Sequence, residues 1–307
     1  MKFQKVQSHI AKNVLRCYTY FTSVTKEVSF TETTKHAYTH TESLLYGHST
    51  AYFPKSEGMY QLHTHDVCEL LLLKSGKASY TVEGRNYPLK KNSLVITRPS
   101  CIHTIRIESD EPYDRYNLLF DPQRLLPDLY NAIPQNLDVL HLDSNHAIVG
   151  LFQKMDLYYQ QFQGKEQERL LTLLAEEIFF NIRLEASHAP EQNAVSSNPL
   201  IQQAIAYIEA HITTLTDIEE ICSALFITKS HLHHLFVRHM QITPKKYIIS
   251  KRLALAQRAL RSGAKPTEIY LKFGFNNYAT FYRDYKRYYG CSPSDELSVP
   301  ELREIPL

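Results

Sequence analysis

The spacing of apolar and polar residues changes twice along this chain. From about residue 44 to 120, apolar residues alternate with polar ones or form short runs, and turn residues interrupt them about every 8–12 positions. From about 145 to 187, apolar residues recur at intervals of three and four, the period of an amphipathic helix. Six further helical patterns follow residue 198. The pattern predicts a β-rich part followed by a helical part.

This order predicts an α+β protein of two domains, which agrees with a length of 307 residues. We expect residues 1–187 to form a β-barrel with flanking helices at about 145–187, preceded by strands or an arm in residues 1–35. Residues 188–198 lack apolar periodicity and are rich in small polar residues, so they are expected to form a linker. Residues 199–307 are expected to form an all-α domain.

Composition limits the class of protein. Apolar residues make up 43% of the chain and charged residues 21%, as in ordinary globular proteins. The sequence has no apolar run near the ~20 residues that span a bilayer, and its start does not resemble a signal peptide. Five cysteines occur without a CxxC pair, which is typical of reduced thiols. We therefore expect a cytoplasmic protein that does not bind membranes.

Charge is concentrated near the end of the chain. Residues 228–290 contain 13 Lys and Arg but only 2 Asp and Glu, a net charge of +11. A block with this imbalance favours a polyanionic partner, although a solvated basic face is the simpler alternative.

Capping residues in and just before the first half of this basic block predict a helix-turn-helix unit. Thr216 with Glu219 predicts a capping box before IEEICSAL, and Thr228 is expected to cap the next helix, KSHLHHLFVRH. In that helix the inward stripe is apolar. The expected outward residues are Lys229, Ser230, His233, His234 and Arg238.

The same arrangement of helix, turn and helix recurs further along the chain. A long helix over about 244–262 follows, and Pro266 then opens a short helix that Gly274 ends. The last helix is expected to turn Phe281 and Tyr285 inward. Its expected outer residues are Asn277, Tyr278, Tyr282, Arg283 and Arg287.

The long helix sets the distance between the two units. Its length is about 28 Å at 1.5 Å per residue, and one turn of B-DNA is about 34 Å. Two recognition helices at that separation can enter consecutive major grooves of double-stranded DNA. Their outward polar side chains would then meet base edges and phosphates.

Residues 214–297 resemble the DNA-binding domain of the AraC/XylS family of bacterial transcription regulators. The resemblance rests on SHLHHLF, on ITPKKYIISKRLALAQRAL, on Gly274-Phe275 followed by Phe281, and on the closing YYGCSPSDE. Cys222 and Tyr270 depart from it, because the family usually has a small residue at both places. The resemblance implies base contacts from Ser230, His233, His234, Asn277, Tyr278 and Arg283.

Two stretches of the N-terminal part resemble cupin motifs. GMYQLHTHDVCELLLLKSG resembles the first motif and PSCIH the second, although Gly58 lies one residue too close to His63 and a glycine expected near Asn92 is absent. In metal-binding cupins the matching residues converge on a divalent ion. Here they are His63, His65, Glu69 and His103. We expect these side chains to contact an organic effector without a cofactor, and a metal site is the alternative.

The interior of this domain is expected to add further effector contacts from Tyr80, Tyr87 and Arg98, and these residue types suit a sugar. The helices at 145–187 either cover the barrel or form the interface of a homodimer. Their apolar stripe is Leu151, Leu170, Leu173, Leu174 and Ile178.

These observations favour a ligand-responsive transcription regulator rather than an enzyme. The AraC/XylS resemblance implies an activator of carbohydrate uptake or utilisation genes, with DNA, a small-molecule effector and RNA polymerase as partners. A metal-dependent cupin enzyme with a nucleic-acid-binding domain is the first alternative. An architectural binder without sequence preference is the second.

Overall fold

The computed structural model describes residues 32–41, 43–52, 62–125, 127–188, 196–296 and 305–306. The arm or strands expected before residue 32 lie outside these ranges. Among the described residues, no helix is long and apolar enough to cross a membrane.

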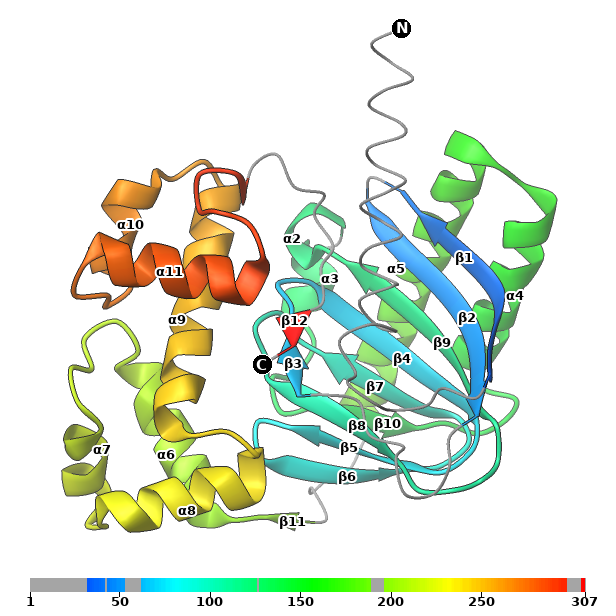
Figure 1. The fold of residues 1–307 in the computed structure, drawn as a ribbon. Helices are drawn as coiled ribbons and strands as arrows, with labels where there is room; N and C mark the ends of the chain where they lie inside the picture. Colours follow the sequence, from blue (N-terminus) through cyan, green and yellow to red (C-terminus); the bar gives the residue numbers. More distant parts are fainter. Residues whose placement is uncertain are drawn as a thin grey trace, which may run out of the picture.

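The N-terminal domain is built on two six-stranded sheets (Figure 1). The first sheet has the order β1 (Glu32–His40), β2 (Leu44–Tyr52), β9 (Tyr113–Phe120), β4 (Cys68–Ser75), β7 (Ser93–Thr97) and β10 (Val139–His141). The second has the order β11 (Ser196–Ser197), β6 (Arg85–Leu89), β5 (Ala78–Val82), β8 (His103–Ile107), β3 (His63–Thr64) and β12 (Ile305–Pro306). The paired strands are antiparallel.

Strand β4 explains why the first sheet has apolar layers on both faces. Successive side chains of a strand point to opposite faces. Leu70 and Leu72 therefore join one apolar cluster, while Leu71 and Leu73 join the cluster shared with the second sheet. An apolar run such as CELLLLKS is typical of a strand buried on both sides.

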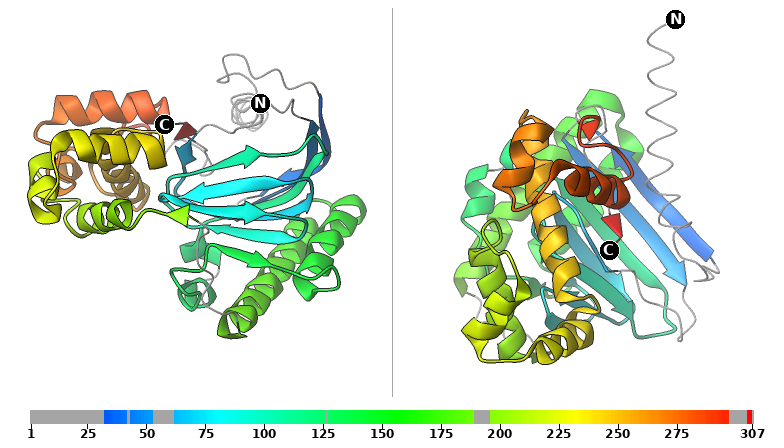
Figure 2. Two further views of the ribbon diagram at one scale, coloured as in Figure 1. Left: turned by 90° about the horizontal axis from the view of Figure 1, so that it is seen from below. Right: turned by 60° about the vertical axis from the view of Figure 1, so that its left-hand side comes forward.

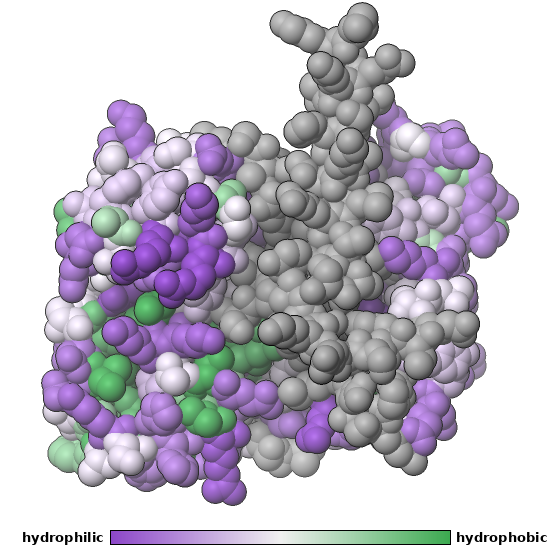
Figure 3. Space-filling view, viewed as in Figure 1, coloured by the Kyte–Doolittle hydropathy of each residue, from purple (hydrophilic) through white to green (hydrophobic). Residues whose placement is uncertain are grey.

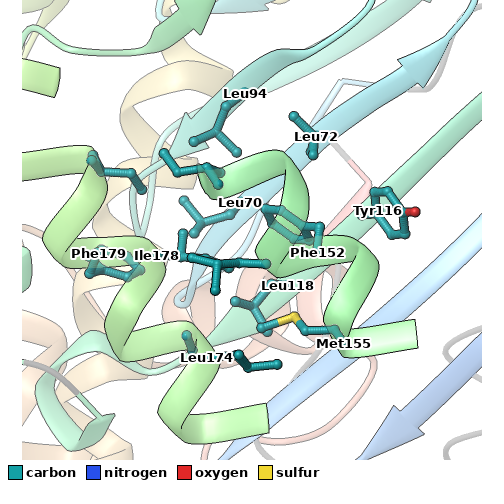
Figure 4. Packing of buried hydrophobic residues seen from close by; sticks show 14 of the residues in the cluster. Leu70, Leu72, Leu94, Tyr116, Leu118, Phe152, Met155, Leu174, Ile178 and Phe179 are labelled. Atoms are coloured by element: carbon teal, nitrogen blue, oxygen red, sulfur yellow. The ribbon is translucent and has the colours of Figure 1, made fainter. Parts of the chain in front are cut away.

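Helices α4 (Ala147–Gln161) and α5 (Gly164–His188) cover the outer face of the first sheet (Figure 2). In Figure 4, Phe152 and Met155 of α4 and Ile178 of α5 lie over leucines of the sheet. The short helices α2 (Pro122–Leu125) and α3 (Pro127–Asn131) precede them.

The prediction of an exposed apolar stripe on α4 and α5 is only partly right: Leu173 is 52% exposed and Leu170 is half-buried, but the other three residues are buried. Leu151, Leu174 and Ile178 are buried in the core beneath the helices, because they face the sheet. The exposed apolar side chains of α5 are Leu173, Phe180 and Leu184.

The C-terminal domain consists of helices around two apolar cores. Helix α9 (Pro244–Arg261) runs between the cores and contributes to both. The first core also contains α6 (Pro199–Ala210), α7 (Ile218–Leu225) and α8 (Lys229–Met240). The second contains α10 (Pro266–Lys272) and α11 (Tyr278–Tyr289). The predicted division into a β-rich N-terminal domain and a helical C-terminal domain is confirmed.

The start of α7 differs from the prediction by one residue. Asp217, not Thr216, is the N-cap, and Glu220 completes the capping box. Thr216 instead donates its hydroxyl and backbone N–H to the Glu220 carboxylate, at 2.6 and 2.8 Å. Two possible caps, Thr216 and Asp217, are adjacent, and two glutamates, Glu219 and Glu220, follow them, so the box could form one position later than expected.

Candidate functional site

The first helix-turn-helix unit consists of α7 and α8. Phe226 ends α7 in the left-handed conformation, and the Thr228 hydroxyl caps α8 by accepting the His231 N–H at 3.2 Å. The predicted inward apolar stripe of α8 is buried and consists of Leu232, Leu235 and Phe236. The predicted DNA-contacting residues Lys229, Ser230, His233, His234 and Arg238 are all exposed.

The second unit consists of α10 and α11, and Gly274 makes its turn. The φ of Gly274 is +77°, and a Cβ there would lie 2.7 Å from the guanidinium carbon of Arg252. Any other residue would therefore strain the backbone and displace Arg252. The side-chain oxygen of Asn277 caps α11 by accepting the Thr280 N–H at 2.8 Å.

Exposure divides the predicted contact residues of α11 into two groups. Asn277, Arg283 and Arg287 are exposed, and Figure 3 shows strongly hydrophilic side chains gathered over this helix. Tyr278 and Tyr282 are half-buried, and the Tyr278 ring packs against Tyr270 with centroids 5.8 Å apart. The family usually has a small residue at position 270. Here the large Tyr270 ring is accommodated by packing against Tyr278.

Some of the basic side chains of this domain bind other groups of the protein and do not face solvent freely. Arg252 donates to the carbonyl oxygens of Ile212 and Gly274, at 2.8 and 2.7 Å, and so joins the segment between α6 and α7 to the turn of the second unit. Lys251 and Arg261 form ion pairs with acidic residues of the N-terminal domain. The net charge of residues 228–290 therefore overstates the positive charge that can meet DNA.

A histidine cluster lies in the N-terminal domain, where His63 is on β3, His65 directly follows β3 and His103 is on β8. One ring nitrogen from each of His63, His65 and His103 lies within 4.8 Å of the others. The Glu69 carboxylate lies 3.3 Å from His65 Nε2 and 3.6 Å from His103 Nε2. All four residues predicted to form this site are therefore brought together.

The hydrogen bonds of the cluster turn the Nε2 atoms of His65 and His103 toward one carboxylate. A carbonyl oxygen only accepts, so His65 Nδ1–H donates to Val67 O at 2.8 Å and His103 Nδ1–H donates to Cys101 O at 3.0 Å. The Nε2 atoms of both rings then point toward the Glu69 carboxylate, and His65 Nε2 is within hydrogen-bond distance of Glu69 Oε2 at 3.3 Å. His103 is only 2% exposed, and its Nε2 has no hydrogen-bond partner.

This arrangement fits a cation. Burial raises the pKa of Glu69, but the neighbouring imidazoles of His103 and His65 outweigh burial and hold that pKa well below its ordinary value. An ionised carboxylate and imidazole nitrogens suit Fe, Mn, Ni or Zn. Backbone carbonyls that receive Nδ1–H are the usual partners that orient metal-ligating histidines. His63, His65, His103 and Glu69 would hold such an ion.

The remaining predicted effector residues divide between two places. Tyr80 lies beside the cluster: its hydroxyl is 2.8 Å from Thr97 Oγ1, and its ring centroid is 6.1 Å from that of His103. Tyr87 and Arg98 instead bind Asp138, at 2.7 and 3.3 Å. No sequence motif pointed to Asp138, because an isolated aspartate carries no spacing signal.

Sequence reasoning also missed the contact between the domains. Glu83, in the turn between β5 and β6, accepts hydrogen bonds from Tyr247 and Lys251 of α9, each at 2.6 Å. Asp66 pairs with Arg261 at the end of α9. The sequence held one signal: Glu83 stands where such a turn prefers Asn, Asp or Gly.

Two families match the chain. Residues 53–182 match the family described as "AraC-like ligand binding domain", and residues 221–297 match the one described as "Helix-turn-helix domain". The HTH-type transcriptional regulator YdiP of Escherichia coli (strain K12) is 21% identical over 79% of this chain and 82% of its own length. The HTH-type transcriptional activator RhaR of Cronobacter sakazakii is 23% identical over 77% of this chain and 86% of its own length. A crystal structure of ToxT from Vibrio cholerae O395 matches 84% of this chain and 98% of its own, with 13% identity and a TM-score of 0.37.

Proposed function

Because the chain belongs to the AraC family of transcriptional regulators, we propose that it binds double-stranded DNA sequence-specifically under the control of a small molecule. The observation that carries the proposal is the pair of helix-turn-helix units joined by one helix. Helix α9 has 18 residues, about 27 Å at 1.5 Å per residue. This length suits two recognition helices in consecutive major grooves.

In this proposal α8 and α11 are the recognition helices. The ten residues of the predicted contact set provide hydrogen-bond donors for base edges and positive charges for phosphates. Arg283 and Arg287 are exposed, and Arg283 is the residue we assign to a base contact, since Arg pairs with guanine most often. Lys229 is also exposed, and its ion pair with Glu219 must open to reach a phosphate.

The experiment that tests DNA recognition is selection from a random pool of duplexes by the full-length protein. We expect enrichment of one motif with two segments whose centres lie about 10–10.5 base pairs apart. A pool that stays random after repeated rounds would contradict the proposal and would favour a binder without sequence preference.

The effector site of this proposal is the interior of the N-terminal domain around the histidine cluster. Imidazole, carboxylate and phenol groups from His65, Glu69 and Tyr80 meet there, and such groups suit the hydroxyls of a sugar. We propose a carbohydrate effector and, with it, activation of carbohydrate uptake or utilisation genes in the bacterial cytoplasm through RNA polymerase. Tyr87 and Arg98 would act from the Asp138 side of the domain.

A thermal-shift screen of the full chain against mono- and disaccharides tests the effector. A ligand at about 100 times its Kd adds about 2.7 kcal/mol to stability. A shift with one sugar supports the proposal, and no shift with any sugar would contradict the carbohydrate assignment.

We also propose that the protein acts as a homodimer, with the outer face of α5 as its interface. Leu173, Phe180 and Leu184 recur at helical spacing along this face, and Phe180 is 56% exposed. Leu157 of the adjacent helix α4 is exposed as well. A second copy of the same helix is the partner that such a narrow apolar stripe fits, as in paired helices.

The enzyme alternative has weaker support. The matched relatives are transcriptional regulators, and the histidine cluster lies close to residues that contact the DNA-binding domain. A ligand site in that position is suited to signalling.

A further inference from the structure

Two backbone segments lie between the histidine cluster and the helical domain. On the cluster side, His65 Nδ1–H binds the carbonyl of Val67 and His103 Nδ1–H binds the carbonyl of Cys101. The Ser100 N–H donates to the carbonyl oxygen of His65 at 2.7 Å. The orientation of the two rings is therefore tied directly to segments 65–67 and 98–102.

The other side of these segments contacts helix α9. Lys251 Nζ donates to the carbonyl oxygen of Ser100 at 3.1 Å and to Glu83 Oε1 at 2.6 Å. The Ile102 N–H donates to the same carboxylate oxygen at 2.9 Å, and the Ile102 side chain packs in the core formed by α6 to α9. The Tyr247 hydroxyl donates to Glu83 Oε2 at 2.6 Å.

A second contact lies at the far end of α9. Asp66 directly follows His65 in the sequence and pairs with Arg261, whose Nε also donates to Glu296 at 2.9 Å. Lys251 and Arg261 are ten residues apart, about 15 Å along a helix. Helix α9, which contributes to the cores of both helix-turn-helix units, is thus held at both places by residues close to the cluster.

Glu83 shows that this contact is costly to build. Its φ is +46°, and its carboxylate is buried. Positive φ at a residue other than glycine and a buried charge each oppose folding unless neighbours compensate. The compensating groups come largely from α9, so the turn is shaped for the contact between the domains.

We propose that the cluster binds a divalent first-row transition-metal ion and that this ion strengthens the contact between α9 and the N-terminal domain. The proposal rests on the proposed function in taking α9 to belong to a DNA-binding domain. It changes one part of the effector site, because His65 and Glu69 hold the ion and a sugar hydroxyl would then meet the ion and Tyr80. The ion displaces any proton from His65 Nε2 and His103 Nε2 to solvent, accepts their lone pairs and offsets the Glu69 charge. It thereby fixes both rings in the orientation whose Nδ1–H groups hold segments 65–67 and 98–102 against α9.

Coupling of this kind is reciprocal. If the ion strengthens the contact, then the contact must strengthen ion binding by the same factor. Residues of α9 that do not touch the cluster should therefore change its affinity for the ion. A site that serves only to stabilise the N-terminal domain would not respond to them.

The test measures the affinity of the full-length protein for Co²⁺ and Zn²⁺ by competition with a chromophoric chelator. We expect a single ion per chain, with visible absorption bands for Co²⁺, and loss of binding in His103→Asn. We expect affinity to fall by about tenfold, within the usual range of coupling between sites, in Lys251→Gln and in Tyr247→Phe. Lys265→Gln is the matched control, since Lys265 is exposed and pairs only with Glu268 among the described residues, and its affinity should be unchanged.

Failure of the inference is distinguishable from failure of the proposed function. No ion binding, or an affinity that is unchanged or tighter in both α9 variants, would overturn the inference while leaving sequence-specific DNA binding intact. Tyr247→Phe removes only a hydroxyl, so it keeps the test valid if Lys251→Gln does not fold. Loss of sequence preference in the random-pool selection would instead refute the proposed function, whatever the ion does.

Discussion

The buried carboxylate of Glu83 provides the most demanding test of how the two domains are joined. We consider Glu83→Gln, which keeps the size of the side chain and removes its charge. The wild-type carboxylate accepts from Ile102 N, Lys251 Nζ and Tyr247 Oη, at 2.9, 2.6 and 2.6 Å. A glutamine offers one oxygen to these three donors and turns its own NH₂ group toward one of them.

The expected loss of unfolding free energy depends on the ion pair that Lys251 keeps in the variant. Removing one partner of a buried ion pair costs about 3–5 kcal/mol. The Lys251 side chain is 11% exposed and keeps an ion pair with Glu209, which is 51% exposed and 3.0 Å away. We therefore expect the lower end, about 3 kcal/mol. At about 2 °C per kcal/mol for a chain of this size, the melting temperature should fall by about 6 °C.

Differential scanning calorimetry of the full-length protein measures this effect, with Glu209→Gln as the control. Glu209 binds the same lysine from an exposed position, so its removal should cost less than about 1 kcal/mol. We expect Glu83→Gln to lower the melting temperature and to separate the unfolding of the two domains. If both variants melted together with wild type, the contact through Glu83 would not stabilise the protein and the reasoning would be wrong.

Three further predictions concern the pH response, DNA contacts and assembly. Burial lowers the pKa of His48, but its hydrogen bonds to Asp114 and Asp156 outweigh burial and raise it. The stability that His48 contributes is therefore complete below its unfolded pKa of about 6.5 and lost as pH rises through the higher folded pKa. The melting temperatures of wild type and His48→Gln should converge as pH rises from 6 to 9. Arg283→Ala should weaken binding to the selected DNA by about 1–3 kcal/mol and relax preference at one base pair, measured by competition. Phe180→Glu should give monomers in analytical ultracentrifugation, because a charge replaces an interface anchor.

Each of these predictions has a clear contrary result. A constant gap between the melting curves of His48→Gln and wild type would show that its ring does not titrate with folding. An unchanged site preference would remove Arg283 from the base contacts. Dimers in Phe180→Glu, at the level of wild type, would place the interface elsewhere.

The sequence was sufficient for the helical domain because capping and turn residues are local. Thr228 and Asn277 cap the predicted helices, and Gly274 makes the predicted turn. The histidine pattern also predicted the cluster, since alternate residues of a strand share a face. The shift of a cap from Thr216 to Asp217 is the kind of detail that competing neighbours decide.

Long-range contacts were beyond sequence reasoning. Lys251 and Arg261 counted as charges for DNA, yet they bind Glu83 and Asp66 of the other domain. Leu174 looked like a surface residue of an amphipathic helix, but the sheet below α5 buries it. In each case the partner lies far away in the chain, and no spacing rule connects them.

The most direct test of the central claim is the specificity ratio of the full-length protein for DNA. It compares affinity for the selected duplex with affinity for a scrambled duplex of equal length, at one salt concentration, since salt alone changes both. We predict a ratio of about a thousandfold or more. Equal affinity for the two duplexes would contradict the account, because two recognition helices that read bases cannot bind both sequences alike.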